Sequence, residues 1–540
     1  MKVRFSSVHT RWVFGAFLFF FTILPGLLFS QEKADKPRLI VGIMVDGLQQ
    51  EHIDLFWSYL DPEGFRMLVD QGVSFRQMQY NIVSAGNAAD VATVMTGTTP
   101  NYHGVAGNNY YDRKTRTEKS ILADNNQVGI GTENRYSASK LLSSTLVDEL
   151  KLASPVNSKC YTIAIDPEVA VMMGGHTANG VTWMDDVYLK WVTTGYYSDG
   201  LMSYADDMNM TGSFAAAADE KWQPLFPVNS YVWNLSNIRK AFEYVPSSRK
   251  GNGDAETLLR TTPAANKLVT DLAVRLMESE ELGRDMYPDI LMLQYTVRTP
   301  YEQFSTVQSI EKEDMYLRLD QELKRLLAAI KDLVGTEETL LFLFSNRTGA
   351  HSPLELGDNK VPAGYFNANR SLALLNTYLM ALYGQGQWVE GYSAKNIFLN
   401  RRLIEESKFN LYEMQQVCAD FMVEFEGVRS AYTAGQILNQ PISGDEQITN
   451  IRNSYHKNSG GDVVFSLLPG WLEVDNNNHP VGETFSTVSN IPVYFWGWKT
   501  LPQKIRKPYY ITDIAPTLAY LLDVPYPNAS VGKLIEEIVE

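Results

Sequence analysis

Several side chains in this sequence are of the types, and near the motifs, that could attack an ester or hold a metal ion. Asp46 ends an apolar run, Ser84 lies in the stretch NIVSAGNAADVATVMTGTTP, and the candidate histidine ligands are His103, His176, His351 and His479. A metal-assisted hydrolase uses a hydroxyl nucleophile that is activated beside a metal ion, and carboxylates and imidazoles bind that ion. One interpretation is therefore a hydrolase with Ser84 as nucleophile and these histidines as ligands.

The elements that must position such residues follow an α/β pattern. The run RLIVGIMVDGLQ, residues 38–49, is apolar up to Asp-Gly, which predicts a buried parallel strand with a loop at its carboxyl end. Leucine and isoleucine then recur at helical spacing over 317–334 before Gly335, and a second apolar run over 339–346 predicts another strand. The segment ITDIAPTLAYLLD predicts a helix over 512–522. Sites of α/β folds lie at the carboxyl ends of such strands.

The first 30 residues are typical of a secretory signal peptide. Lys2, Arg4 and Arg11 precede an apolar run from Val13 to Phe29, and we expect this segment to be removed after export. The net charge of −15 becomes more negative without those three basic residues, which disfavours nucleic acid and anionic membranes as partners. The sequence predicts an exported protein, periplasmic or at the cell surface, with no membrane span after cleavage.

The mature chain, 31–540, is predicted to be one domain with two additions. Residues 183–260 are rich in Tyr and Trp and predict an elaboration on the core, and residues 355–480 predict an inserted lobe. Cys160 and Cys418 are the only cysteines. They either pair or remain two buried free thiols, and both alternatives are open at this point.

The order of the motifs resembles one superfamily. VDG at a strand end is followed by MTGTTPNYHGVAGNNYYD, GGHTANGVTWMDD, DILMLQYT, SIEKEDMYLRLD, LFLFSN and ITDIAPTLAYLLDVPYP. This order is similar to that of the alkaline phosphatase superfamily, in the branch of bacterial periplasmic phosphate monoesterases and type I phosphodiesterases/nucleotide pyrophosphatases. The resemblance implies a three-layer α/β sandwich with a mostly parallel central sheet, helices on both faces, and insertions.

The resemblance also implies a chemistry that this sequence does not match. In the superfamily, two zinc ions activate a threonine or serine and clamp the phosphoryl oxygens. The nucleophile position falls on Asn87, and the metal-ligand positions fall on Asp46, Thr299, Gln303, Asn346, Arg347 and possibly His479. An amide cannot attack phosphorus, and an arginine remains charged and cannot bind a cation. We therefore expect vestigial positions and no cofactor.

The phosphate-binding positions of the branch are changed as well. A Lys-x-Arg segment that grips phosphate falls on Asp166 and Glu168, so both charges are reversed. The phosphate-contacting asparagine is retained as Asn108, which is equally consistent with a structural role in a turn. His103 and His176 belong to turn motifs that the family keeps for structural reasons.

These observations favour a pseudoenzyme, that is, an exported alkaline-phosphatase-like protein that binds a protein or glycan partner in the cell envelope or acts as a scaffold there. The alternative is an active phosphoric-ester hydrolase, a phosphatase or phosphodiesterase, that uses a relocated site. A third interpretation, compatible with the first, is a carbohydrate or peptide binder whose contact surface is the Tyr- and Trp-rich addition.

A buried carboxylate without a metal needs another cation. Arg347 is predicted to end the strand next to that of Asp46. We expect a hydrogen-bonded pair of Asp46 and Arg347, with Arg298 as the second choice of partner.

Overall fold

The central strand of the fold is β1 (Leu39–Asp46), in which all eight residues are buried. The computed structural model describes residues 36–83, 86–185, 187–234, 241–248, 254–300, 308–346, 353–439, 446–477, 479, 481 and 490–539. The predicted signal peptide lies outside these ranges. Within them, no helix is both long and apolar enough to cross a membrane.

β1 lies between two parallel neighbours, β9 (Asp289–Thr296) and β10 (Thr339–Ser345), in register from Leu39 onward. Among the described residues these strands form part of an 11-stranded sheet in the order β18-β2-β17-β10-β1-β9-β6-β7-β8-β5, with β19 paired to β2. The other strands are β2 (Val73–Gln79), β5 (Gly129–Ile130), β6 (Cys160–Ala164), β7 (Gly180–Met184), β8 (Trp191–Thr194), β17 (Asn490–Gly497), β18 (Gln503–Ile505) and β19 (Tyr509–Tyr510).

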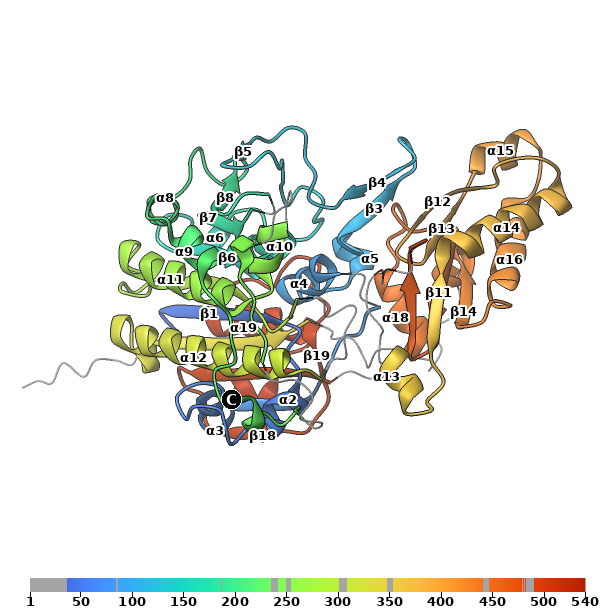
Figure 1. The fold of residues 1–540 in the computed structure, drawn as a ribbon. Helices are drawn as coiled ribbons and strands as arrows, with labels where there is room; N and C mark the ends of the chain where they lie inside the picture. The colour runs from blue at the N-terminus through green and yellow to red at the C-terminus, as the bar shows by residue number, and fades with distance from the viewer. Residues whose placement is uncertain are drawn as a thin grey trace, which may run out of the picture. The chain divides into compact units, whose positions relative to one another are not determined.

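Helices cover both faces of this sheet (Figure 1). Alternate β1 residues, such as Leu39 and Val41, pack in a cluster with α2 (Gln50–Leu55), α3 (Phe65–Gln71), α8 (Ser203–Met210), α9 (Ser213–Asp219), α11 (Pro263–Ser279) and α12 (Ile310–Leu333). Ile40 and Met44 point to the other face, where α4 (Asn87–Thr96), α6 (Leu146–Ala153), α7 (Pro167–Gly174) and α19 (Ile514–Leu522) lie. Because strand residues alternate between faces, β1 belongs to both clusters. The predicted three-layer α/β sandwich is confirmed.

The predicted elements are present with shifted ends. The helix expected over 317–334 is α12, which starts earlier because the Ser309 hydroxyl accepts a hydrogen bond from the Lys312 backbone N–H at 3.2 Å and caps it. The helix expected over 512–522 begins as a short 3₁₀ turn, Ile511–Asp513, and continues as α19. Buried apolar runs thus determine the elements, and caps determine where the helices begin.

The aromatic residues expected to form a contact surface within 183–260 are largely core residues. Trp183 and Trp191 lie in β7 and β8 of the central sheet and are 1% and 0% exposed. Trp222 is also buried, and its indole N–H donates to Asp314 of α12 at 2.6 Å. These tryptophans therefore cannot provide the contact surface considered from the sequence.

Residues 353–474, called the lobe below, carry a separate set of elements (orange in Figure 1). Its strands form a four-stranded antiparallel sheet, β12-β13-β15-β14, and a parallel pair, β11 and β16. A hydrophobic cluster of its own includes Leu375, Met414 and Val463. The elements are α13 (Pro353–Asp358), β11 (Gly364–Asn367), α14 (Ala368–Tyr383), β12 (Val389–Ser393), β13 (Asn396–Leu399), α15 (Arg401–Glu406), α16 (Leu411–Met422), β14 (Val428–Thr433), α17 (Ala434–Asn439), α18 (Glu446–Ser454), β15 (Val463–Leu467) and β16 (Trp471–Val474).

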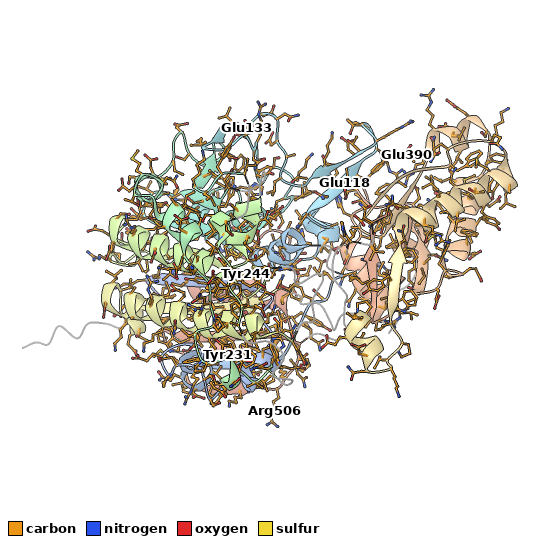
Figure 2. All side chains as sticks on the ribbon, viewed as in Figure 1. Glu118, Glu133, Tyr231, Tyr244, Glu390 and Arg506 are labelled. Atoms are coloured by element: carbon orange, nitrogen blue, oxygen red, sulfur yellow. The ribbon has the colours of Figure 1, made fainter. Side chains whose placement is uncertain are left out.

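A hairpin of the core, β3 (Asn109–Asp112) and β4 (Thr117–Ser120), contacts the lobe. Figure 2 labels Glu118 on this hairpin and Glu390 on β12 of the lobe. The Ser393 hydroxyl donates to Glu118 at 2.7 Å, and the Tyr111 hydroxyl donates to the Glu390 carbonyl at 2.9 Å. Polar contacts from both sides therefore join the hairpin to the lobe.

The strongest of these contacts centres on Asp462, whose side chain is 0% exposed. Its carboxylate accepts hydrogen bonds from Arg113 of the hairpin at 2.8 Å, from Arg401 at 2.9 Å, from Gln415 at 3.0 Å and from the Leu399 backbone N–H at 2.8 Å. One buried carboxylate thus holds two lobe helices, a lobe strand and the core hairpin together.

The two cysteines do not form a disulfide. Cys160 lies in β6 in the core, and Cys418 lies in α16 in the lobe; both are buried and free. Burial raises the pKa of each thiol well above its usual range. Of the two alternatives left open by the sequence, the structure selects two free thiols.

Candidate functional site

Asp46, the last residue of β1, is 3% exposed and lies where three parallel strands end. Asn346 directly follows β10, and Arg298 and Thr299 follow β9. Because β9 and β10 flank β1 in register, their carboxyl ends bring these residues to one edge of the sheet. Asn87, the first residue of α4, reaches the same point from the neighbouring layer.

Hydrogen bonds fix the orientation of both amides in this group. The Asn346 Oδ1 atom accepts from the Gly47 backbone N–H at 2.9 Å, so Nδ2 of Asn346 must face the other way. That Nδ2 donates to Asp46 Oδ1 at 2.5 Å and to Asn87 Oδ1 at 2.8 Å. The remaining Asn87 Nδ2 faces Asp46 Oδ2 at 3.4 Å. The predicted nucleophile position therefore carries an amide that is engaged through both of its ends.

The cation beside Asp46 is Arg298. Its Nε lies 2.6 Å from Asp46 Oδ2, and its side chain is 39% exposed while that of Asp46 is 4% exposed. Arg347, the partner preferred from the sequence, lies outside the described residues, and the second choice forms the pair. Asp46 Oδ1 thus accepts from the Asn346 amide, and Oδ2 lies next to the Asn87 amide and the Arg298 guanidinium. Polar and cationic neighbours therefore compensate the buried carboxylate.

Asn108 has a structural role in this protein. Its Oδ1 accepts a hydrogen bond from the backbone N–H of Ala88 at 2.9 Å and so satisfies a free donor in the first turn of α4. The helix is preceded by Gly86 at φ 130°, and a Cβ there would lie 2.5 Å from Asn108 Oδ1. Glycine is required at this position because Asn108 approaches its backbone so closely.

The charge reversal at Asp166 is compensated, which the sequence did not indicate. Arg260, the last residue of α10 (Asp254–Arg260), donates to Asp166 Oδ1 at 2.7 Å, and Gln294 of β9 donates to Oδ2 at 2.7 Å. Glu168 lies in the first turn of α7. No local pattern could identify Arg260, because it comes from an addition 94 positions away from Asp166.

Of the other predicted positions, some lie among the described residues and some do not. Thr299 is buried beside Arg298 in the chain. His479 is 59% exposed, and its Nδ1 lies 3.6 Å from Asp475 in a turn. His176 contacts the hydroxyl of Tyr196 at 3.1 Å. Ser84, Gln303 and His351 lie outside the described residues.

A cavity of about 1080 Å³ opens above Asp46 and extends to the lobe. Its core side includes Asp46, Asn87, Asn108, Asp166 and Arg298, and its lobe side is formed by residues from β12 to β16 and α18. Glu118, labelled in Figure 2, lines it from the core hairpin. The site is therefore the floor of a larger cleft whose second wall is the lobe.

His103 is a structural residue. It is 0% exposed; Nδ1 accepts from the Val105 backbone N–H at 3.2 Å, so Nε2 carries the proton and donates to Thr93 Oγ1 at 3.1 Å. Burial lowers the pKa of His103 to about 3. The imidazole is thus neutral in the folded protein and must gain a proton when the protein unfolds in mild acid.

A pH dependence of stability follows from His103. Since its folded pKa lies below the ordinary value of 6.5, its contribution is complete above about pH 6.5 and is lost as the pH falls toward 3. Between pH 7 and pH 5 the free energy of unfolding should fall by about 2 kcal/mol through this group. Urea unfolding at both pH values should show this loss in the wild type and in the control His479→Gln, but not in His103→Gln. An unchanged pH slope in His103→Gln would contradict the assignment.

Comparison with known proteins identifies the family. Residues 40–487 match the type I phosphodiesterase / nucleotide pyrophosphatase family. The chain belongs to this family. It is similar to the alkaline phosphatase PafA of Elizabethkingia meningoseptica, at 25% identity over 98% of this chain and 99% of PafA. It is also similar to the alkaline phosphatase PhoV of Synechococcus elongatus, at 27% identity over 95% of this chain and 94% of PhoV. A Myroides odoratus protein described as a calcium-transporting ATPase is 29% identical over 95% of this chain and 96% of that protein.

The crystal structure of PafA superposes with a TM-score of 0.84 at 25% identity, covering 94% of this chain and 99% of PafA. A second PafA structure, with a TM-score of 0.85, carries replacements of a threonine, an asparagine, a lysine and an arginine. The replaced threonine and asparagine of PafA are separated by the same number of positions as Asn87 and Asn108 of this chain. The replaced lysine and arginine are separated by the same number of positions as Asp166 and Glu168.

The prediction that this protein has no cofactor is wrong. Its relatives PafA and PhoV are alkaline phosphatases, and the family resemblance implies two zinc ions for that chemistry. The described side chains around Asp46 do not fit such ions, however. Both Asp46 oxygens face N–H donors, and the described residues contain no group of three or more His, Cys, Asp or Glu that could hold a metal. We therefore derive no reaction step through zinc at Asp46.

Proposed function

We propose that this member of the family is a pseudoenzyme: an exported protein of the cell envelope that binds a protein or glycan partner in the cleft and does not hydrolyse phosphate esters through the family's nucleophile position. The observation that carries the proposal is the amide of Asn87, which is hydrogen-bonded to both Asp46 and Asn346. An amide offers no nucleophilic oxygen, and this one is also held in place by its neighbours.

The electrostatics of the floor support the same proposal. Asp166 occupies the position of a cationic phosphate-gripping residue, and Arg260 is engaged by it at 2.7 Å. Arg298 is likewise engaged by Asp46. Because these two guanidinium groups already have carboxylate partners, a phosphoryl dianion would have to compete with those carboxylates. The floor is therefore better suited to hold its own side chains than to bind phosphate.

The proposal predicts the result of a hydrolysis assay. Turnover of p-nitrophenyl phosphate and bis-p-nitrophenyl phosphate should be the same in the wild type and in Asn87→Ala, with and without added ZnCl₂, and no higher than the buffer rate. PafA, purified and assayed in parallel, provides the positive control. Zinc is supplied so that a negative result cannot be attributed to metal lost during purification.

The assay also tests the alternative of a relocated hydrolase site. Turnover that Ser84→Ala abolishes while Asn87→Ala leaves it intact would establish a hydrolase with Ser84 as nucleophile. Turnover that Asn87→Ala reduces would mean that the amide takes part in the chemistry. Either result would replace the pseudoenzyme proposal.

A further inference from the structure

The charge of the cleft argues against an anionic ligand. Among the described residues that line it, eight carry carboxylates and four carry cationic groups, namely Arg260, Arg298, Lys395 and Arg429. Like charges in a cleft repel an approaching ion of the same sign. An anionic ligand would thus meet an excess of four negative charges, and the described cations on the floor, Arg260 and Arg298, already have carboxylate partners.

The carboxylates Asp46, Asp166 and Glu473 already have partners within the protein, so a cationic ligand would have to compete for them. Asp46 and Asp166 have arginine partners. On the lobe wall, Glu473 accepts from the Tyr392 hydroxyl at 2.8 Å and lies 3.8 Å from Lys395 Nζ. Burial raises the pKa of Glu473 and lowers that of Lys395.

The cleft is also lined by uncharged donors and acceptors. Asn109, Asn369 and Asn450 line the cleft, and their amides make no hydrogen bond to another residue in the part of the chain that the structure describes. Beside them, Gln447 Nε2 donates to Ser466 Oγ at 2.8 Å and to Ser430 Oγ at 3.0 Å. Amides and hydroxyls both donate and accept, so they match a ligand that is rich in hydroxyl groups.

An aromatic ring is built into the same wall. Trp471, the first residue of β16, lines the cleft and is partly buried. Its ring lies so close to the lobe backbone that a Cβ on Gly427, at φ +89°, would be 2.1 Å away, and one on Gly364 would be 2.8 Å away. Two glycines thus allow the indole to lie directly against the backbone. A fixed ring of this kind favours contact with the C–H groups of a neutral ligand.

Together these features identify a ligand class. We infer that the lobe wall, formed by Asn369, Asn450, the Ser466 and Gln447 pair and Trp471, binds an uncharged oligosaccharide. The cleft is slightly larger than the roughly 300–1,000 Å³ of sites for drug-sized ligands, so it has room for several sugar rings. The inference rests on the proposed function, because it names the partner of the same cleft.

The test uses the purified full chain on an array of neutral oligosaccharides, their sulfated and phosphorylated forms, amino sugars and uncharged peptides. Calorimetry then measures the dissociation constant for the strongest neutral oligosaccharide. We expect binding to neutral oligosaccharides and at least about tenfold weaker binding to the sulfated forms of the same chains. Asn369→Ala combined with Asn450→Ala should weaken binding at least about tenfold, since each variant removes a hydrogen-bonding group.

Asn439→Ala is the matched control, because Asn439 is exposed at the end of α17 and does not line the cleft. Trp471→Ala is a further variant, accompanied by circular dichroism because its ring packs against the lobe. The inference is overturned if no neutral oligosaccharide binds, if sulfated sugars, amines or peptides bind better, or if the double variant binds like the wild type. If the protein hydrolyses phosphate esters and binds no glycan, both the inference and the proposed function are overturned. If it neither hydrolyses phosphate esters nor binds a glycan, only the inference is overturned.

Discussion

Replacing Asp462 with alanine is expected to lower the free energy of unfolding by about 3–5 kcal/mol, the usual effect of removing one partner of a buried ion pair. The Asp462 side chain is fully buried, and its partners Arg113 and Arg401 are 24% and 49% exposed. Without the carboxylate, the Leu399 N–H and the Gln415 amide also lose their acceptor. The loss of these two hydrogen bonds adds to that of the charge pairs.

Urea unfolding monitored by tryptophan fluorescence measures this effect. The control is Asp420→Ala in α16, because Asp420 is exposed and bonded only to the exposed Gln416 among the described residues. We expect the control to change the free energy of unfolding by less than about 0.5 kcal/mol. Because the hairpin that holds Arg113 joins the core to the lobe, Asp462→Ala should also separate the transition into two steps. A single transition with wild-type stability would show that Asp462 does not hold the two together.

The second large effect is expected at the floor of the cleft. Arg298→Met removes the guanidinium that lies 2.6 Å from Asp46 while keeping most of the side-chain volume. Because Arg298 is 39% exposed, water can replace part of the interaction, so we expect a loss of about 1–3 kcal/mol rather than the full cost of a buried pair. Arg402→Met, at a side chain that is 78% exposed, should have little effect.

A double-mutant cycle isolates the pair itself. In Asp46→Asn the charge is absent, so adding Arg298→Met to that variant should destabilise less than it does in the wild type. The difference between the two effects is the coupling energy of Asp46 and Arg298. Equal effects of Arg298→Met in both backgrounds would mean that the guanidinium does not serve as the counter-charge of Asp46.

The sequence was sufficient for the parts of the site that depend on strand ends. An apolar run ending in Asp46 and another ending at Asn346 predict parallel strands, and neighbouring parallel strands bring such residues together. The order of the motifs was likewise sufficient for the family. The sequence placed Asp46, Asn87 and Asn346 in one group, and in the structure hydrogen bonds of 2.5 to 3.4 Å join these three side chains.

What the sequence could not decide depends on side-chain direction and on distant segments. Arg298 and Arg347 both follow strands that flank β1, and the direction of each side chain depends on the backbone after its strand, which the sequence pattern does not specify. Arg260 reaches Asp166 from an added helix, and Arg113 reaches Asp462 across 349 positions. Neither contact leaves a periodic or local signal, because both depend on how separate elements pack.

The two unpaired cysteines provide a thiol in each part of the molecule. Cys160 is enclosed in the core sheet and Cys418 in the lobe, so an alkylating reagent can modify each thiol only after the surrounding structure opens. The rate of labelling at each position, read by mass spectrometry, then reports the free energy of opening of that part alone. The native sequence therefore already contains one reporter for the core and one for the lobe, and the movement of each can be followed without introducing a probe.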